Sequence, residues 1–191
     1  MNWYLVVLAY FIGAIPTGYI VGKMKGIDIK SKYSGNIGGA NAIRSLGVFL
    51  GVLVGVTDIL KAYLAVYLAT PYGSLTTAGA ALAVVLGNVF NVFLNFKGGK
   101  GMAHIFGALI AIHPVSFLII AVIEWGVFVF KRYTSLANLV SAPFLGPVMY
   151  AVTGDPNYFF LGLLLMLIVY FSHRENIERL MNGTEWRWGY V

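Results

Sequence analysis

Long apolar stretches separated by short polar turns make up most of this sequence. Runs with at most two charged residues cover residues 3–21, 48–69, 75–94, 102–130, 136–152 and 158–172. A helix needs about 20 apolar residues to cross the hydrocarbon core of a bilayer. The pattern therefore predicts an all-α integral membrane protein in which the polar residues are confined to the turns between helices.

The composition supports this interpretation and limits the chemistry. Of 191 residues, 59% are hydrophobic and 10% are charged, whereas soluble domains carry about 25% charged residues. The apolar segments use most of the length, so we expect a single integral membrane domain over residues 1–191. The absence of cysteine excludes a thiolate nucleophile and a cysteine-based metal site. No His and Glu residues have metal-ligand spacing, so no metal or cofactor is expected, and nucleic acid is not an expected partner.

The apolar stretch at residues 102–130 has two interpretations. As one helix it is long, and as two it breaks at His113-Pro114 into short pieces. Two helices give seven spans in total and place 12 cations on one side: Lys23, Lys25, Lys30, Lys32, Arg44, Lys97, Lys100, Lys131, Arg132, Arg174, Arg179 and Arg187. The loops left on the other side contain no Lys or Arg. The positive-inside rule then predicts a bundle of seven helices with the N-terminus outside and the C-terminus in the cytoplasm. The short spans are half-buried or tilted, and interfacial segments lie on the cytoplasmic side.

A polar, glycine-rich stretch at residues 34–44, here called the serine–glycine segment, interrupts the apolar pattern. Its sequence is SGNIGGANAIR. Glycines allow successive N–H groups to converge on an anion, and Arg44 adds a forked donor suited to phosphate. The simpler alternative is a glycine-rich turn that precedes a helix.

A second stretch at residues 96–101, the glycine–lysine segment, has the sequence FKGGKG. It is not a Walker A loop, because Gly101 rather than Ser or Thr follows Lys100. Lys97 and Lys100 have an alternative role as cytoplasmic anchors of the neighbouring helices. The predicted topology places both segments and His173 on the cytoplasmic face, which indicates a pocket for phosphate.

Other polar residues lie within or beside the apolar runs. Asp58 and Lys61 share one helix face at spacing i, i+3, and they either brace the helix or line the site. For Glu124, within the apolar run at residues 102–130, we expect a hydrogen bond between helices rather than a catalytic role. His173 and Asn176 also have i, i+3 spacing, so both can point the same way from a helix that starts the C-terminal tail.

These residues together resemble the PlsY family of bacterial membrane acyltransferases. The resemblance rests on the serine–glycine segment, Asp58-Ile59-Leu60-Lys61, the glycine–lysine segment, residues 131–136 (KRYTSL) and residues 173–177 (HRENI). It implies transfer of a fatty acyl chain from acyl-phosphate to glycerol 3-phosphate, giving lysophosphatidic acid, at the bacterial cytoplasmic membrane and without a cofactor. It implies catalytic roles for Ser34, Arg44, Lys100, His173 and Asn176. The residues that we expect to bind phosphate or substrate are Gly35, Asn36, Gly38, Asn41, Lys97, Gly98, Gly99, Gly101 and Asn138.

The chain also departs from the family pattern near the expected site. The family usually has Thr at Ala40, His at Asn88, Pro at Asn91, Gly at Ala62, Ser at Asn138 and a small residue at His104. These departures leave open an altered acceptor or a paralogue that binds or transports a phosphorylated metabolite or lipid. A transporter has its site near the membrane midplane, whereas these motifs are predicted at one membrane face.

Overall fold

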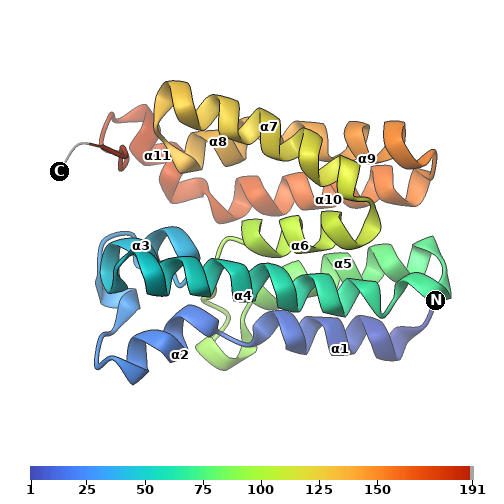
Figure 1. Ribbon diagram of the computed structural model, residues 1–191, viewed down its shortest axis with the longest axis horizontal. Coiled ribbons are helices and arrows are strands. Elements are labelled where there is room, and N and C mark those ends of the chain that lie inside the picture. The colour runs from blue at the N-terminus through green and yellow to red at the C-terminus, as the bar shows by residue number, and fades with distance from the viewer. Residues whose placement is uncertain (190–191) are drawn as a thin grey trace. The chain divides into compact units, whose positions relative to one another are not determined.

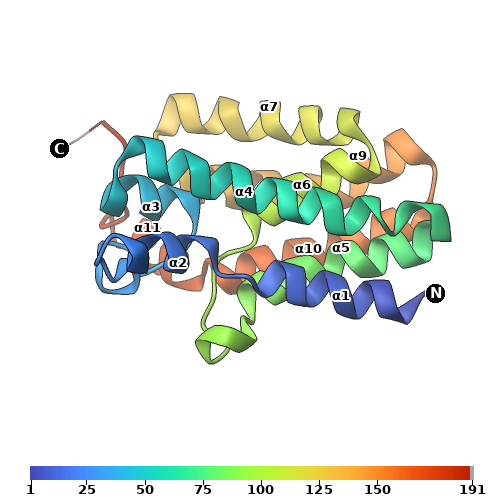
Figure 2. The same cartoon turned by 60° about the horizontal axis from the view of Figure 1, so that its bottom comes forward.

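The computed structural model describes residues 1–189, and these form helices and turns without a strand. The helices group into two compact units, one from Met1 to Ile112 and one that begins at His113. Each unit is described by itself (Figures 1 and 2).

The first unit contains six α-helices and three short 3₁₀ turns among its described residues. They are α1 (Trp3–Ala14), α2 (Thr17–Met24), η1 (Ile29–Ser31), α3 (Gly39–Leu46), α4 (Val48–Tyr67), η2 (Thr70–Tyr72), α5 (Ser74–Val89), η3 (Val92–Leu94) and α6 (Met102–Ile112). The first apolar run is therefore two helices, because Pro16 has no N–H group to continue the α1 ladder.

Helices α1 and α5 lie side by side and run in the same direction. Polar contacts join them along their length: Asn2 N to Thr76 Oγ1 at 3.1 Å, Tyr10 Oη to Phe90 O at 2.7 Å, and Asn91 Nδ2 to Ala14 O at 2.7 Å. A Cβ at Gly13 or at Gly87 would collide with the partner's backbone. Such close approach of backbones at small residues is typical of helix packing in membranes.

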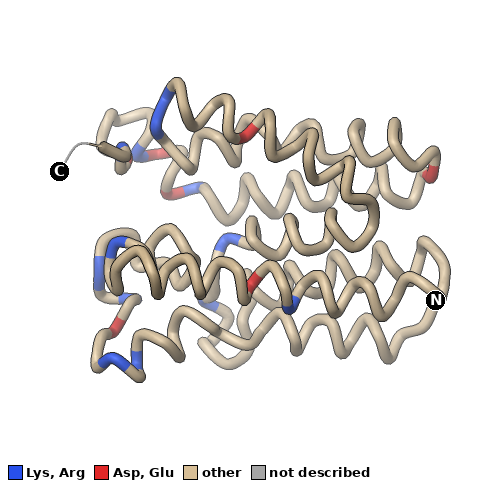
Figure 3. The backbone as a smooth tube through the Cα atoms, in the orientation of Figure 1, with Lys and Arg blue, Asp and Glu red and all other residues tan. Residues whose placement is uncertain are grey.

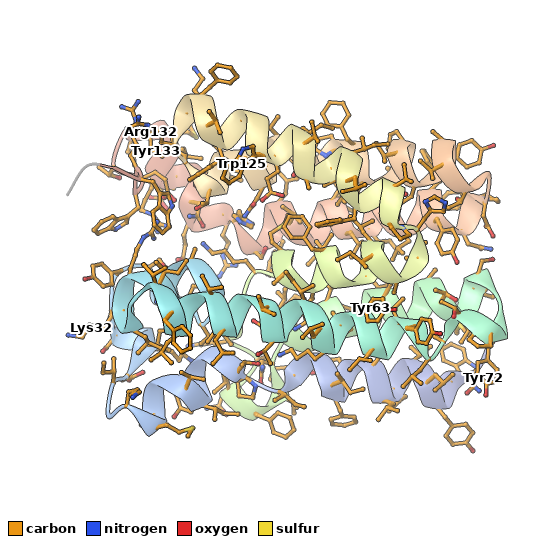
Figure 4. All side chains as sticks on the ribbon, viewed as in Figure 1. Lys32, Tyr63, Tyr72, Trp125, Arg132 and Tyr133 are labelled. Carbon is orange, nitrogen blue, oxygen red and sulfur yellow. The ribbon has the colours of Figure 1, made fainter. Side chains whose placement is uncertain are left out.

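Helix α4 packs against α3, α5 and α6. It starts at the end of the unit that carries the serine–glycine segment and finishes at η2, beside the start of α5. Lys32 and Tyr72 mark these two ends (Figure 4). Most Lys and Arg positions of this unit lie toward the end with α2 and α3 (Figure 3). The serine–glycine and glycine–lysine segments both connect helices at that end, since one follows α2 and the other follows α5.

The second unit contains five α-helices and one 3₁₀ turn among its described residues. They are α7 (Pro114–Lys131), α8 (Thr134–Ser141), η4 (Ala142–Phe144), α9 (Leu145–Thr153), α10 (Pro156–Ser172) and α11 (Arg174–Met181). Helix α10 packs on α9, and α7 packs on α8 and α9. Arg132 and Tyr133 follow α7, while Trp125 lies on the exposed side of that helix (Figure 4).

Among residues 1–189, five helical stretches are long and apolar enough to cross a membrane: Trp3–Met24, Val48–Tyr72, Ser74–Leu94, Pro114–Lys131 and Thr134–Thr153. A sixth is formed if α10 and α11, bent by 59°, count as one span. With 11 residues, α6 is too short to cross alone, since a helix rises about 1.5 Å per residue and the hydrocarbon core is about 30 Å thick. The all-α membrane fold and the break at His113-Pro114 are confirmed. The predicted count of seven is approximate, because five or six stretches among residues 1–189 are long enough to span and α6 is a shorter apolar helix.

Candidate functional site

Asn41 organises the serine–glycine segment. Its side chain is buried, and its Nδ2 donates to Ile29 O at 3.1 Å, Lys32 O at 3.3 Å and Asn36 O at 2.7 Å. Its Oδ1 accepts from Ser34 N at 3.3 Å. The backbone from η1 to Asn36 is thus wrapped around one amide, and Asn41 shapes the segment from inside.

The start of α3 is the anion-attracting part of this segment. Gly38 is the N-cap residue, and its N–H donates to Asn36 Oδ1 at 2.8 Å. The first N–H groups of a helix have no intrahelical acceptor and carry the positive end of its dipole. Ala40 is exposed, and Arg44, which is half-buried, lies four residues later on the same face. A negatively charged group on this face meets backbone donors and a guanidinium.

Asn88 plays the organising role for the glycine–lysine segment. Gly98 N donates to Val89 O at 3.1 Å, Gly99 N to Asn88 O at 2.9 Å and Gly101 N to Asn88 Oδ1 at 3.1 Å. A Cβ at Gly98 would collide with the Asn88 carbonyl, and a Cβ at Gly99 would collide with the Asn88 side chain. Glycine is needed here because the segment lies directly against α5.

This geometry corrects the reason that we gave for Gly98, Gly99 and Gly101. We expected their N–H groups to form an open nest for an anion. All three instead donate within the first unit, so they hold the segment in place, and its cations are left to attract the ligand. Lys97 is exposed and Lys100 is half-buried.

The turn η1, which precedes the serine–glycine segment, contacts the glycine–lysine segment within the first unit. Lys30 Nζ, from η1, donates to Lys97 O at 3.3 Å. Beneath them, Leu94 packs against a buried apolar cluster formed by Ile29, Ile37, Ala42 and Val54. The sequence predicts both segments at the same membrane face. In the structure they are joined through adjoining residues, since Lys30 contacts Lys97 and Leu94 packs against the cluster that contains Ile37 and Ala42.

Asp58 and Lys61 form a brace rather than a surface open to a ligand. Lys61 Nζ lies 2.8 Å from Asp58 Oδ1, and Thr17 Oγ1 donates to the same oxygen at 2.9 Å. Lys61 also donates to Ile15 O. The pair therefore ties α4 to the break between α1 and α2, where Pro16 interrupts the backbone ladder. Nearby in sequence to Lys100, His104 is buried in α6, and its Nε2 has no partner within residues 1–189.

His173 is the central polar side chain of the second unit. It is buried at the bend between α10 and α11. Its Nδ1 lies 2.9 Å from Val169 O, and its Nε2 lies 3.1 Å from the side-chain amide of Asn138, on α8. The other face of that amide meets Thr134 O and a carboxylate oxygen of Glu124, on α7. The hydrogen bond between helices that we predicted at Glu124 forms when the Asn138 amide is turned so that its nitrogen faces Glu124.

Glu185 organises the neighbouring part of the second unit, and the sequence reasoning missed it. Its carboxylate accepts from Ser135 Oγ at 2.8 Å, from Asn176 Nδ2 at 2.7 Å and from Arg179 Nε at 2.7 Å. Burial opposes ionisation of this carboxyl, but the hydrogen bonds from Arg179, Asn176 and Ser135 and the charge of Arg179 outweigh it, so the pKa of Glu185 is lowered. Asn176 is thereby held in one orientation.

The comparisons with known proteins bear on the whole chain. A family profile described as glycerol-3-phosphate acyltransferase matches residues 3–183. The chain belongs to the glycerol-3-phosphate acyltransferase family. A family member from Thermosipho melanesiensis is 39% identical over 182 residues, covering 95% of this chain and 90% of the relative. One from Aquifex aeolicus is 38% identical over 188 residues, covering 96% and 97%.

Two solved structures of this acyltransferase family are also similar. Both are crystal structures of PlsY, described as an integral membrane glycerol 3-phosphate acyltransferase, in a glycerol 3-phosphate form and a lysophosphatidic acid form. Their TM-scores are 0.94 and 0.91. Each is 35% identical to this chain and covers 98% of it, with 95% of the PlsY chain matched. The resemblance to the PlsY family is therefore confirmed, as is a multi-pass membrane fold.

The site residues predicted for this glycerol-3-phosphate acyltransferase fall into two groups. The first unit holds Ser34, Gly35, Asn36, Gly38, Asn41, Arg44, Lys97, Gly98, Gly99, Lys100 and Gly101, and the second holds Asn138, His173 and Asn176. In the first unit Lys30, which precedes the serine–glycine segment, donates to Lys97, and in the second unit Asn138 contacts His173 directly. Among residues 1–189, no three His, Asp or Glu side chains gather closely enough to hold a metal ion.

Proposed function

We propose that this protein transfers a fatty acyl chain from acyl-phosphate to glycerol 3-phosphate, producing lysophosphatidic acid. Membership of the glycerol-3-phosphate acyltransferase family supports the acceptor and the reaction class. The names of the PlsY structures mention glycerol 3-phosphate and lysophosphatidic acid, which supports this acceptor and product. Acyl-phosphate as the donor is our extension, since both substrates then present a phosphate to a cationic site.

The observation that carries this proposal is the hydrogen bond from Lys30, four residues before the serine–glycine segment, to the carbonyl of Lys97 in the glycine–lysine segment. It supports one pocket that contains the start of α3, Arg44 and Lys100. Arginine binds phosphate through a planar fork, and lysine acts as a compact point charge. Together with backbone N–H groups they suit a phosphomonoester such as glycerol 3-phosphate.

The reaction requires no covalent intermediate on the protein. A hydroxyl oxygen of glycerol 3-phosphate attacks the acyl carbon, a new ester C–O bond forms, and the bond between the acyl carbon and the phosphate oxygen breaks. The hydroxyl proton is accepted by a substrate phosphate, and inorganic phosphate leaves. The contribution of the protein is then to position both substrates and to stabilise charge that develops on oxygen.

Ser34, Arg44, Lys100, His173 and Asn176 are the residues to which we assign this work. Within the set, Asn176 is oriented by Glu185 and His173 is oriented by Val169 and Asn138. Preorganised groups of this kind stabilise a transition state without a reorganisation cost during the reaction.

We also propose that the protein is a single domain in the bacterial cytoplasmic membrane, with the N-terminus outside and the C-terminus inside. The support is the distribution of Lys and Arg along the sequence. Both polar segments then face the cytoplasm, where glycerol 3-phosphate is available.

The donor is tested with purified protein in detergent, labelled glycerol 3-phosphate and either palmitoyl-phosphate or palmitoyl-coenzyme A. We expect labelled lysophosphatidic acid from palmitoyl-phosphate alone, with release of inorganic phosphate. Product from palmitoyl-coenzyme A only would contradict the proposed donor. Uptake of label into proteoliposomes without any acyl transfer would favour a transporter instead.

A further inference from the structure

Glu124 is a carboxylate within the membrane-spanning helix α7, and the proposed reaction gives it no role. An ionised carboxylate at the centre of a spanning helix costs about 2.5–3.5 kcal/mol on insertion scales. Such groups are therefore expected to pair with another polar group inside the protein. The contact of Glu124 with the Asn138 amide and the contact of that amide with His173 supply such a partner.

The hydrogen-bond partners of His173 limit where its protons lie. Nδ1 is 2.9 Å from Val169 O, and a carbonyl oxygen only accepts, so Nδ1 carries a hydrogen. Ser172 Oγ lies 3.3 Å from Nδ1 and donates to Val169 O at 3.1 Å. Ser172 Oγ is therefore also an acceptor for the hydrogen on Nδ1 of His173. The charge of His173 then depends on whether Nε2 donates or accepts.

The orientation of the Asn138 amide decides this question. With its nitrogen toward His173, the amide oxygen faces Thr134 O and Glu124. Thr134 O has no hydrogen to give, so only a protonated Glu124 relieves the clash of acceptors. With its oxygen toward His173, the amide accepts from Nε2 at 3.1 Å and donates to Thr134 O at 3.1 Å and to Glu124. The second orientation gives partners to the amide, to Nε2 of His173 and to Oε1 of Glu124, while Oε2 of Glu124 has no partner among residues 1–189.

The second orientation also sets two charges. Nε2 must donate while Nδ1 still carries its hydrogen, so His173 is an imidazolium. Glu124 accepts a hydrogen bond from the amide, and its ionised form is the one that compensates the imidazolium. The half-buried charge of Glu124 on α7 and the buried charge of His173 at the end of α10 are then linked through one amide, as expected for charges removed from water.

We propose that Glu124, acting through Asn138, holds His173 as an imidazolium. Glu124 and Asn138 are then positioning residues that act on His173 rather than on substrate. The consequence for catalysis rests on the proposed function: a fixed cation at His173 attracts the phosphate groups of the substrates and of the released inorganic phosphate. Asn138 is central to this proposal, because its amide lies between Glu124 and His173 and contacts both.

The other charged groups on the elements around His173 are either in ion pairs or exposed to solvent. On α11, Arg174 lies 3.9 Å from Glu175, and Arg179 lies 2.7 Å from Glu185 of the tail. Glu178 on α11 is exposed, and Lys131 and Arg132 at the end of α7 are exposed cations. Glu124 is connected to the His173 ring through the side-chain amide of Asn138 when the amide oxygen faces Nε2.

The test is ¹⁵N nuclear magnetic resonance of histidine-labelled full-length protein in detergent at neutral pH. The chain has three histidines, and His173→Gln assigns the signals. We expect both ring nitrogens of His173 to be protonated in the wild type. Glu124→Gln keeps the side-chain shape and removes the charge, so Nε2 should lose its proton. Asn138→Ser shortens the bridge and should give the same neutral ring, with no further change when Glu124→Gln is added.

The matched control is Glu175→Gln, which removes an exposed carboxylate two residues from His173 and should leave the ring protonated. Unchanged signals from the other histidines show that each variant is folded. A neutral His173 in the wild type, or an imidazolium that persists in Glu124→Gln, overturns the proposal.

In the acyl-phosphate assay, Glu124→Gln should lower kcat by about tenfold, as loss of an outer hydrogen-bond partner typically does. The expected spectra in a wild-type protein without acyltransferase activity would support the Glu124–His173 link and overturn only the proposed function.

Discussion

Lys30 Nζ donates a hydrogen bond to the backbone carbonyl of Lys97 at 3.3 Å, although the two residues are 67 positions apart. Each residue belongs to a polar connection at the same end of the first unit. Under them, Leu94 from η3 rests on the apolar cluster around Ile29 and Ile37. The polar contact and the apolar cluster together keep the serine–glycine and glycine–lysine segments adjacent.

The first prediction concerns Asn41. Replacing it with alanine removes four hydrogen bonds from a buried amide. At about 0.5–1.5 kcal/mol each, we expect Asn41→Ala to lower the free energy of unfolding by about 2–6 kcal/mol in a denaturant titration in micelles. Acyltransferase activity should fall as well. Asn36→Ala loses a single side-chain contact to Gly38 N and should cost about 1 kcal/mol. Equal stability of the two variants would contradict the organising role of Asn41.

A pair of glycine substitutions tests the packing of the glycine–lysine segment. Gly98→Ala places a Cβ against the Asn88 carbonyl, whereas a Cβ at Gly55, within α4, meets nothing within 4 Å. We expect Gly98→Ala to be less stable and to lose activity. Gly55→Ala should be neutral or more stable by up to about 1 kcal/mol, because alanine favours a helix. Activity and thermal unfolding of both variants check this, and tolerance of Gly98→Ala would show that the segment is not held against α5.

Much of the fold could be predicted from the sequence, because the positions of the helices depend on local composition. Pro16 and Pro114 mark the helix breaks, and the apolar runs mark the spans. The site was only partly readable. The N–H groups of Gly98, Gly99 and Gly101 are taken by Val89 and Asn88, which precede them by about one helical turn and a loop. No sequence pattern predicts these hydrogen bonds to Val89 and Asn88, because they depend on how α5 packs against the connection that follows it.

Glu185 illustrates the same limit in the second unit. It lies in a tail with few apolar residues, and its partners come from both α8 and α11. A single carboxylate has no spacing signature, so only the tertiary arrangement reveals that it orients Asn176. The contact between Glu124 and Asn138 was likewise hidden, since α7 and α8 are adjacent but the side chains that meet are 14 positions apart.

The pH dependence of stability should reveal Glu185. Its pKa is lowered in the folded protein, so its ionised form stabilises the fold above the ordinary glutamate pKa of about 4.3. That contribution is lost as the pH falls through the lower folded value. We expect Glu185→Gln to reduce the unfolding temperature at pH 7, with the gap to wild type closing under acidic conditions. Glu178→Gln, at an exposed position of α11, is the control. A gap that is the same at neutral and strongly acidic pH would be inconsistent with this role.

The topology has a direct chemical test because the chain contains no cysteine. Tyr72→Cys and Lys32→Cys place single thiols at exposed positions near opposite ends of the first unit (Figure 4). In intact bacterial cells, a membrane-impermeant maleimide should label Tyr72→Cys. It should label Lys32→Cys only after the membrane is opened. The reverse pattern would place the polar segments outside the cytoplasm and contradict the predicted orientation.

The central claim is that Arg44 and Lys100 serve one phosphate pocket, and steady-state acyl transfer from palmitoyl-phosphate to glycerol 3-phosphate tests it most directly. Arg44→Ala and Lys100→Ala should each lower kcat/KM by about a hundredfold or more, as expected when a charge-stabilising donor is lost. Lys25→Ala, which removes an exposed cation after α2, should retain wild-type activity. Full activity in either Arg44→Ala or Lys100→Ala would contradict the account.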